Sequence, residues 1–263
     1  MKLCDKEVGK IGFGTWGIGG GYWQKDYSKD KESIEILRYA YEKGFRLFDT
    51  AEMYGDGHSE ELVGKALNEY EDVLIVSKVW SNHLRHDDLI KSAINSRKRL
   101  GIKSIDLYLI HWPNNRVPIE ESIRAMEELI DSGVIRCMGV SNFDVKLLKD
   151  AMQSAKKYEI AVNEIEYNVF HKSPENDIIP FAKENKIEII AYSPLAKGEV
   201  IYDSILKKIG EKYNKTSVQI ALNYLLKNSI PIPKASNKKH IDEIMGSIDF
   251  QINEEDYEIL KKL

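Results

Sequence analysis

The sequence predicts an α/β protein whose strands close into a (β/α)8 barrel. Apolar, β-branched runs of strand length recur along the 263 residues, and segments of helical periodicity separate them. Parallel neighbours need a crossover connection, which these helices supply. Nearly every run also ends on a side chain that can hydrogen-bond or titrate. A doubly wound open sheet needs such groups mainly at its switch point. A barrel of about 250 residues brings every strand end to one mouth, so we favour the barrel.

Eight strands are predicted from these runs, in chain order over residues 11–15, 45–49, 73–78, 105–111, 135–141, 161–166, 187–192 and 230–234. Their polar ends are Thr15, Asp49, Lys78, His111, Ser141, Asn142, Glu164, Glu166, Tyr192, Ser193 and Lys234. We also expect a short N-terminal β-hairpin to cap the bottom of the barrel.

The helices between the strands carry start and stop signals. Ser28 precedes a helix predicted over residues 31–43, and Gly44 ends that helix. The segment 131–133 (Asp-Ser-Gly) ends another helix. Asn237 is a natural N-cap for a helix over residues 238–245. No linker, charge block or low-complexity tract divides the chain, so we expect a single domain over residues 1–263.

Composition restricts the partners and the compartment. The 38 basic and 42 acidic residues are interspersed and give a formal net charge of −4. No basic face is indicated that could neutralise a row of phosphates, so we expect no nucleic-acid partner. No window approaches about 18 consecutive apolar residues, and the N-terminal residues lack the apolar stretch of a secretory signal. These features favour a cytoplasmic protein with no membrane contact, as a monomer or weak homo-oligomer.

The only two cysteines are Cys4 and Cys137. They are too few for a disulfide framework and lack the CxxC spacing of a zinc or redox site, so a reducing compartment fits. The segment 12–17 matches GxGxxG, and a Rossmann interpretation would take Asp49 as the ribose-binding acid. In that motif the glycines open the helix that binds pyrophosphate, whereas here a glycine-rich polar stretch intervenes. The Rossmann interpretation is therefore the weaker alternative.

Four residues of the predicted mouth suggest a proton-donating site: Asp49, Tyr54, Lys78 and His111. Each has an ordinary structural explanation by itself, such as an ion pair between Asp49 and Lys78 at the rim of the core. Their combination at neighbouring strand ends is what favours a catalytic site.

The chemistry of this set is that of carbonyl reduction. A tyrosine with its ordinary pKa of about 10 is a poor acid at neutral pH, and the ammonium of Lys78 would lower that pKa. Asp49 would keep Lys78 charged and oriented, and His111 would be a second donor to the same oxygen. Such a pair of donors stabilises an alkoxide that develops on a carbonyl oxygen. The set contains no activated nucleophile and no metal ligands, so the hydride must come from a nicotinamide cofactor.

The motifs around these residues resemble the ordered signature of the aldo-keto reductases. The matching segments are Asp49-Thr50-Ala51-x-x-Tyr54-Gly55, Ser77-Lys78, Ile110-His111-Trp112-Pro113, Gly139-Val140-Ser141-Asn142-Phe143, Ala191-Tyr192-Ser193-Pro194-Leu195 and Ile232-Pro233-Lys234. The likeness covers residues 11–263 and indicates a short-loop, prokaryotic member. It implies a (β/α)8 barrel that binds NADP(H) without a Rossmann motif and reduces aldehydes and ketones over a broad range. It also implies Tyr54 as general acid, with Asp49, Lys78 and His111 completing the tetrad.

The resemblance also implies where the cofactor lies. Ser141, Asn142 and Glu164 would hold the nicotinamide carboxamide, and Tyr192 would stack on its ring. The alternative for the Ser141–Asn142 pair is the N-cap of a helix over residues 143–152. Ser193, Leu195, Lys197 and Gly198 would contact the pyrophosphate, and Lys234, Ser236, Asn237 and His240 would surround the adenosine 2′-phosphate. The other implied cofactor-binding residues are Gly14, Thr15, Trp16, Asp49, Pro194 and Glu243.

Four positions depart from the family pattern. Glu164 stands where glutamine is usual, and His240 stands where arginine is common, so the bidentate phosphate fork is missing. Ile244 replaces an asparagine, and Ala235 replaces a frequent serine. NADPH should still be preferred over NADH through Lys234.

The residues that would line the substrate pocket are Trp16, Met53, Tyr54, Trp80, His111 and Trp112, with Tyr22 or Trp23 as further candidates. Ordinary packing is the alternative for these aromatic residues. A metal at the HxxH pair His83 and His86 has no supporting ligands, so we expect none. The short segment 112–118 predicts an open pocket and a broad substrate range. A nucleotide-binding regulatory or structural protein with little turnover is the alternative function.

Overall fold

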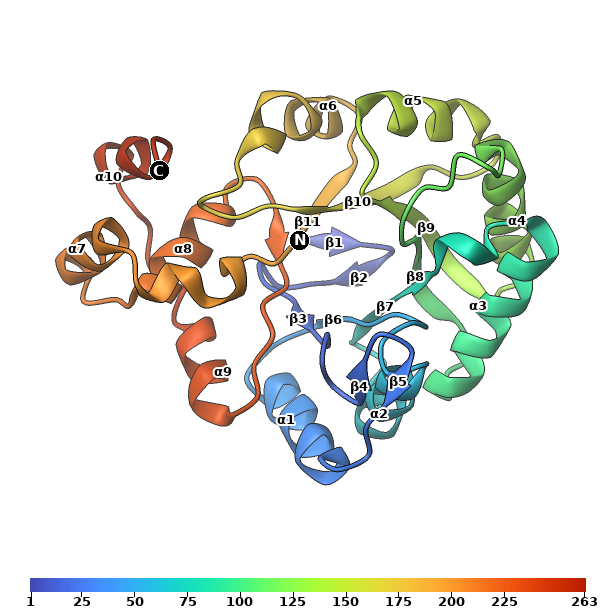
Figure 1. The fold of residues 1–263 in the computed structure, drawn as a ribbon, viewed down its shortest axis with the longest axis horizontal. Coiled ribbons are helices and arrows are strands. Elements are labelled where there is room, and N and C mark those ends of the chain that lie inside the picture. Colours follow the sequence, from blue (N-terminus) through green and yellow to red (C-terminus); the bar gives the residue numbers. More distant parts are fainter.

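The computed structural model describes residues 1–263, and its centre is a ring of parallel strands surrounded by helices (Figure 1). The eight strands follow the order β12-β11-β10-β9-β8-β7-β6-β3, and every pair is parallel. Their bounds are β3 Phe13–Gly14, β6 Leu47–Asp49, β7 Leu74–Val79, β8 Ile105–Ile110, β9 Ile135–Ser141, β10 Ile160–Glu166, β11 Glu188–Tyr192 and β12 Ile230–Pro231. Every predicted strand run overlaps one of them.

Backbone hydrogen bonds between the first and last of these strands close the ring. The amide of Gly12 donates to the carbonyl of Pro231 at 2.9 Å, and the amide of Gly14 donates to that of Pro233 at 3.1 Å. Both prolines lack an amide hydrogen, and here they only accept. The predicted (β/α)8 barrel is confirmed.

The helices are α1 Asp30–Glu42, α2 His58–Leu67, α3 His86–Leu100, α4 Ile119–Asp131, α5 Val145–Ser154, α6 Ile178–Glu184, α7 Ser204–Tyr213, α8 Ser217–Leu225, α9 Lys238–Met245 and α10 Glu254–Leu260. Three short 3₁₀ segments cover Ser81–His83, Ser173–Asn176 and Ala196–Ile201. Helix α10 lies beside α7, outside the ring of helices (Figure 1). No helix is long and apolar enough to cross a membrane.

Two apolar cores hold the layers together. Inward-facing strand residues such as Leu47, Val76 and Leu109 form one cluster of 11 buried residues inside the barrel. A larger cluster of 57 buried residues lies between the strands and the helices. Side chains alternate between the two faces of a strand, so strands buried on both faces are apolar throughout. This explains why the strand runs were visible in the sequence.

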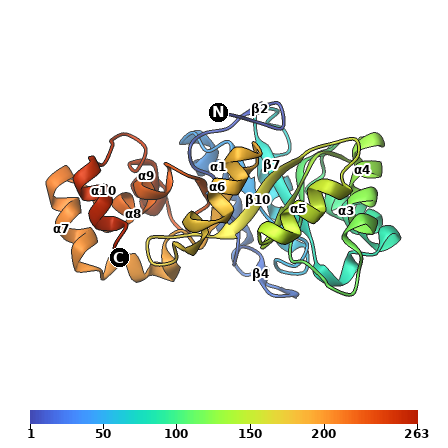
Figure 2. The same cartoon turned by 90° about the horizontal axis from the view of Figure 1, so that it is seen from above.

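A β-hairpin caps the bottom of the barrel, as predicted. Strands β1 (Lys2–Leu3) and β2 (Lys6–Glu7) place Leu3 and Val8 in the interior cluster. Lys6 Nζ lies 2.8 Å from Asp106 Oδ1 at the start of β8. Strand β4 (Gly20–Gly21) belongs to a second hairpin, and Figure 2 shows it at the end of the barrel opposite to the first hairpin.

The two cysteines are joined in a disulfide, Cys4 to Cys137, which ties this hairpin to β9. The sequence analysis predicted no such bond, because partners 133 residues apart carry no local pairing signal. It expected only that two cysteines suit a reducing compartment, and the structure adds the covalent link between them.

Helix starts were predicted less well than strands. Asn237 caps α9 as predicted, with its side chain accepting from a backbone amide. Helix α1 begins at Asp30, one residue before the predicted start. Its N-cap position is occupied by Lys29, which makes no side-chain cap, so Ser28 does not cap the helix. The Ser141–Asn142 pair does not cap α5 either, since Asp144 does so.

Candidate active site

The four residues of the predicted tetrad meet at the mouth of the barrel. Asp49 ends β6, Lys78 lies in β7, His111 follows β8, and Tyr54 lies in the loop after β6. Lys78 Nζ donates to Asp49 Oδ2 at 2.6 Å, to the Thr50 carbonyl at 3.1 Å and to the Tyr54 hydroxyl at 3.4 Å. The rings of Tyr54 and His111 meet edge to face, 5.8 Å apart. One ammonium therefore joins the carboxylate to the phenol.

Burial dominates the electrostatics of this cluster. Burial lowers the pKa of Lys78, but the carboxyl groups of Asp49 and Glu164 outweigh it and leave that pKa above its ordinary value. Burial raises the pKa of Tyr54, although Lys78 acts in the opposite direction. Burial and then the Lys78 charge hold the pKa of His111 well below its usual range. At neutral pH the phenol is protonated and the imidazole is neutral.

Glu164 belongs to this cluster as well. It lies in β10, only 2% exposed, with Oε1 3.4 Å from Lys78 Nζ. Its other oxygen, Oε2, is buried without a hydrogen-bond partner. The sequence reasoning expected it only to hold the carboxamide.

The second hairpin positions the loop that carries Tyr54. Strands β4 (Gly20–Gly21) and β5 (Gln24–Lys25) form it, and the Gly55 amide donates to the Gly21 carbonyl at 2.7 Å. Tyr22 forms a β-bridge with Tyr54. Gly55 has φ +57°, and an added Cβ would collide with the Gly19 carbonyl, so glycine is required there. The sequence analysis did not predict this hairpin, although its three consecutive glycines are a turn signal.

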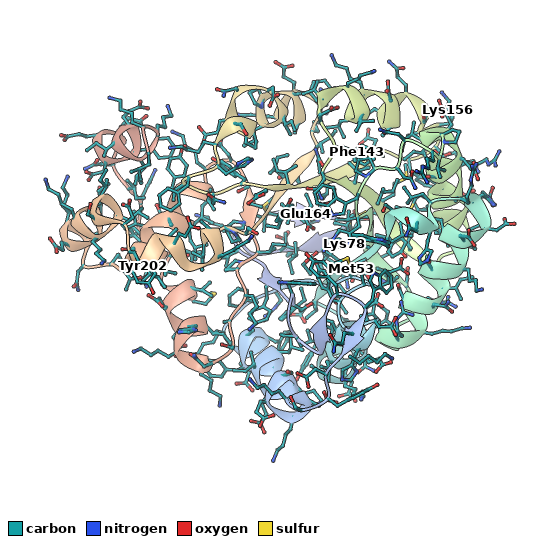
Figure 3. The ribbon with its side chains drawn as sticks, in the orientation of Figure 1. Met53, Lys78, Phe143, Lys156, Glu164 and Tyr202 are labelled. Atoms are coloured by element: carbon teal, nitrogen blue, oxygen red, sulfur yellow. A yellow bond between two sulfur atoms is a disulfide. The ribbon has the colours of Figure 1, made fainter.

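Aromatic side chains surround the tetrad. The ring of Trp16 lies 5.0 Å from that of Tyr54 and 4.3 Å from that of Tyr22, while the ring of Trp80 lies 5.4 Å from that of His111. Trp16 and Trp112 are 40% and 43% exposed, far more than core residues. Met53 is 3% exposed and packs with Tyr54 and Trp80. Of the residues predicted to line the substrate pocket, five lie in this region: Trp16, Met53, Tyr54, Trp80 and His111. Trp112 directly follows His111 in the chain. Figure 3 shows Met53 and Lys78 close together at the barrel centre.

A hydrogen-bonded pair of residues lies where the carboxamide was predicted. Asn142 Nδ2 donates to the His111 carbonyl at 3.0 Å and to Ser141 Oγ at 3.0 Å, and its Oδ1 accepts from the Tyr192 hydroxyl at 2.8 Å. Asn142 has φ +62°, in the left-handed region. Strain of this kind at a strand end is typical of functional sites.

The segment after β11 is also strained. Ser193, Ala196 and Lys197 have φ of 49°, 45° and 53°, and Gly198 has φ 97°. Successive left-handed residues leave backbone groups that can approach a ligand closely. Pro194 and Leu195 lie within this segment, so the residues predicted to contact pyrophosphate are contiguous in one irregular loop.

The predicted 2′-phosphate residues gather at the start of α9. Lys234, Ser236 and His240 are exposed there, and the Asn237 side chain caps the helix. Partial burial of its ammonium and then the Lys29 charge lower the pKa of Lys234, and no carboxylate pairs with it. An uncompensated cation near a helix N-terminus suits an anion.

Three further residues were predicted to bind the cofactor: Gly14, Thr15 and Glu243. Gly14 and Thr15 are buried at the end of β3, and Thr15 Oγ1 lies 2.8 Å from Ser59 Oγ, so this hydroxyl is already paired within the protein. Glu243 lies on α9, and Gln219 Nε2 donates to its carbonyl. Ala235 and Ile244 are buried, so both departures from the family pattern fill the apolar core beneath α9.

The HxxH pair does not converge. His83 Nδ1 lies 2.9 Å from Glu52, whereas His86 contacts Asp87 at 2.8 Å and Glu128 at 3.0 Å. The two rings therefore face different carboxylates.

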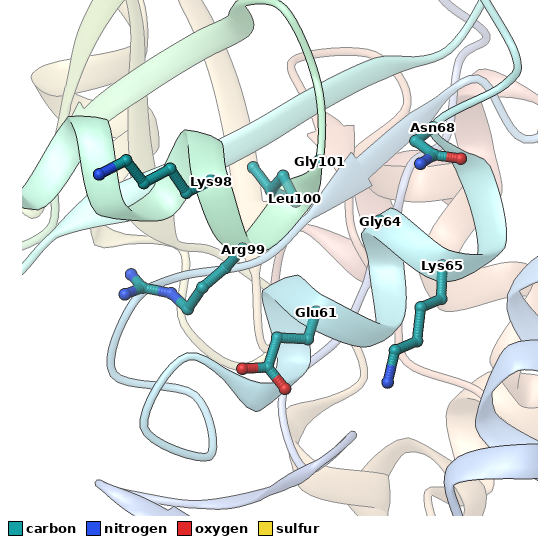
Figure 4. Close-up of a pocket in the computed structure, with 8 residues that line it drawn as sticks. All are labelled: Glu61, Gly64, Lys65, Asn68, Lys98, Arg99, Leu100 and Gly101. Atoms are coloured by element: carbon teal, nitrogen blue, oxygen red, sulfur yellow. The ribbon is translucent and has the colours of Figure 1, made fainter.

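A groove of about 430 Å³ lies elsewhere, between α2 and α3 (Figure 4). Its lining includes Lys65, Lys98 and Arg99, but Arg99 Nε is bound to the buried Glu60 at 2.6 Å. None of the predicted site residues lines this groove.

Comparisons with known proteins show which family this chain resembles. A model of the Aldo/keto reductase family matches residues 10–263. Aldo-keto reductase YhdN of Bacillus subtilis (strain 168) is 40% identical over 203 residues, which are 73% of this chain and 60% of that protein, less than two thirds of its length. Methylglyoxal reductase YeaE of Escherichia coli (strain K12) is 32% identical over 266 residues, which are 98% of this chain and 92% of that protein.

Solved structures are similar over nearly their full length. The thermostable aldo-keto reductase Tm1743, in complex with the inhibitor epalrestat, has a TM-score of 0.94 and 40% identity, with 100% of this chain and 98% of that chain covered. An aldo/keto reductase from Klebsiella pneumoniae, in complex with NADP and acetate, has a TM-score of 0.90 and 29% identity, with 97% of this chain and 91% of that chain covered.

Proposed function

The chain belongs to the aldo/keto reductase family, and on that premise we propose that it reduces aldehydes and ketones to alcohols with NADPH, using Tyr54 as the general acid. The class of reaction is that of an NADP-dependent oxidoreductase acting on carbonyl groups. One observation carries the finer proposal. The Tyr54 hydroxyl lies 3.4 Å from the Lys78 ammonium, which is itself held by Asp49 at 2.6 Å.

The tetrad residues divide the protonation of an alkoxide between them. Burial raises the pKa of Tyr54, so the phenol keeps its proton until a more basic alkoxide develops beside it. Lys78 then stabilises the phenolate that is left. His111 is neutral because burial lowers its pKa, so it can donate one N–H hydrogen bond without delivering a proton. Tyr54 is therefore the proton donor.

The rest of the mouth fits the parts of a nicotinamide dinucleotide. Glu164, whose backbone carbonyl accepts from the Asn142 amide, has a buried side-chain oxygen without a partner, which suits the N–H group of a carboxamide. The irregular loop after β11 suits the pyrophosphate, and Lys234 suits the 2′-phosphate. When bound, the reduced nicotinamide supplies a hydride to the carbonyl carbon.

The aromatic side chains around Tyr54 favour a carbonyl with an apolar or aromatic body. The methylglyoxal reductase of Escherichia coli suggests small dicarbonyls as further substrates. We therefore propose a broad range of aldehydes and ketones.

Replacement of the acid tests this function. Tyr54→Phe should lower kcat at least about 100-fold, because general acid catalysis contributes that much, and should leave NADPH binding nearly unchanged. The measurements are NADPH oxidation with an aromatic aldehyde and with methylglyoxal, and fluorescence titration with NADPH.

The matched control is Tyr202→Phe, which alters an 81% exposed tyrosine at the periphery (Figure 3) and should leave kcat unchanged. Retained turnover in Tyr54→Phe would refute the acid assignment. A parent protein that binds NADPH but reduces none of these carbonyls would instead support the nucleotide-binding, non-catalytic alternative.

A further inference from the structure

The buried cluster beneath Tyr54 contains one carboxyl group more than it has cations. Asp49, Lys78 and Glu164 are all at most 2% exposed. Lys78 Nζ lies 2.6 Å from Asp49 Oδ2 and 3.4 Å from Glu164 Oε1. If both carboxyl groups were ionised, the cluster would carry a net negative charge out of contact with water, which is costly.

Geometry decides which carboxyl group keeps a proton. Asp49 has the short contact to the ammonium, so it is the better stabilised as an anion. Glu164 has the longer contact, and its Oε2 has no partner. Both carboxyl groups contact the same ammonium, and burial and then the charge of Asp49 raise the pKa of Glu164 well above its usual value. A neutral Glu164 can donate to Asp49 and still accept, much as an amide would.

Four titratable groups face Glu164 from the surrounding elements. Asp49 comes from β6, Lys78 from β7, Tyr54 from the loop after β6, and Tyr192 from β11. Lys78 is the only cation among them, and it is also the group nearest to the Tyr54 hydroxyl.

We propose that Glu164 is a positioning residue that holds a proton at neutral pH, donates it as a hydrogen bond to Asp49, and so leaves the Lys78 charge free to act on Tyr54. This inference rests on the proposed role of Tyr54 as general acid. When Glu164 loses its proton at alkaline pH, its negative charge opposes that of Lys78. The Tyr54 phenolate then becomes less stable, and the pKa of the phenol rises.

The test is Glu164→Gln, which keeps the shape of the side chain and removes the ionisation. Oxidation of an alcohol with NADP requires the Tyr54 phenolate, so its rate rises through an alkaline limb. In Glu164→Gln this limb should move about one pH unit to lower pH, because no carboxylate forms beside Lys78. Glu164 also belongs to the proposed carboxamide site, so the readout is the position of the limb on the pH axis and not the absolute value of kcat.

A second measurement needs neither cofactor nor turnover. Each protein is titrated with alkali, and the ultraviolet absorbance of the same protein carrying Tyr54→Phe is subtracted. The difference is the absorbance of the Tyr54 phenolate. It should develop at lower pH in Glu164→Gln. Glu164→Met, also uncharged, should show the same spectroscopic shift even if kcat falls. The control is Glu166→Gln, which removes an exposed carboxylate from the same strand and should move neither curve.

The outcomes are distinct. An unchanged alkaline limb and an unchanged phenolate titration in Glu164→Gln would overturn the inference and leave the proposed function standing. A uniform loss of kcat at every pH without a shift would assign Glu164 a merely structural role and would also overturn it. Retained turnover in Tyr54→Phe would remove the proposed function itself.

Discussion

At the scale of single residues, the charges at the two ends of the site are balanced differently. Lys78 is buried and paired with a carboxylate 2.6 Å away, so its charge is fixed before any ligand arrives. Lys234 is exposed to solvent and has no carboxylate partner, and partial burial and then Lys29 lower its pKa. A phosphate dianion could form a charge-assisted hydrogen bond with the Lys234 ammonium. Because no carboxylate competes for this cation, that bond would add to the affinity for a phosphorylated ligand.

Lys234 should therefore discriminate between the two nicotinamide cofactors. Lys234→Ala should reduce the ratio of kcat/KM for NADPH to that for NADH about 10- to 100-fold, since a hydrogen bond to a charged group contributes about 1.5–3 kcal/mol. Steady-state kinetics with both cofactors measure the ratio. Lys183→Ala removes an exposed lysine of α6 and should leave it unchanged. Equal efficiency with both cofactors in the parent would contradict the selectivity.

The residues of the tetrad could be predicted because each stands at or just beyond a strand end, and a barrel brings strand ends together. The charge state of Glu164 could not be predicted from the sequence. It depends on the 3.4 Å separation from Lys78 and on a buried neighbour, Asp49, from a different strand. Neither distance nor burial has a signature in the order of residues.

At the scale of elements, the loop from β8 to α4 is short and begins at the tetrad residue His111. Beyond His111 it runs only from Trp112 to Pro118, and Trp112 within it is 43% exposed. A loop of this length leaves little chain to close over a bound substrate. The aromatic side chains near Tyr54 then offer apolar contact without enclosing the ligand, and such contact discriminates weakly.

A broad substrate range follows from this short loop. Kinetics of NADPH oxidation with a panel of aldehydes, ketones and sugars should give activity across several classes, with Michaelis constants well above the micromolar range. Aromatic and small apolar carbonyls should be preferred to sugars. One strongly preferred substrate with a micromolar Michaelis constant would be incompatible with an open mouth.

The elements differ in how well the sequence predicts them. The strands are buried on both faces, so each is a continuous apolar run that stands out from its surroundings. The β4–β5 hairpin has strands of two residues each and no alternating pattern. What holds it is long-range contact, such as the bond from the Gly55 amide to the Gly21 carbonyl. Contacts of that kind cannot be inferred from local periodicity.

At the scale of the whole molecule, the candidate active site lies at one end of the barrel, and the disulfide and the N-terminal hairpin lie at the other. The tetrad lies at the mouth, where the Gly55 amide binds the β4–β5 hairpin. Figure 2 shows β4 and β2 at opposite ends of the barrel, so the β1–β2 hairpin closes the bottom. The bottom carries the disulfide from Cys4 to Cys137 and the ion pair of Lys6 with Asp106. These contacts join the first residues of the chain to strands in the middle of the barrel, so they act on stability without touching the site.

Reduction of the disulfide should therefore lower the melting temperature and leave catalysis intact. A bond between residues 133 positions apart restricts the unfolded chain by about 5 kcal/mol in the loop-entropy model, which is an upper value. For a chain of this size each kcal/mol corresponds to about 2–4 °C, so the oxidised protein should melt at most about 10–20 °C above the reduced one. Circular dichroism with and without a reductant measures this difference. Cys4→Ser should melt like the reduced protein in both conditions, with kcat at moderate temperature unchanged. If thiol titration finds the oxidised parent free of thiols and reduction still leaves its melting temperature unchanged, the hairpin does not stabilise the barrel through this bond.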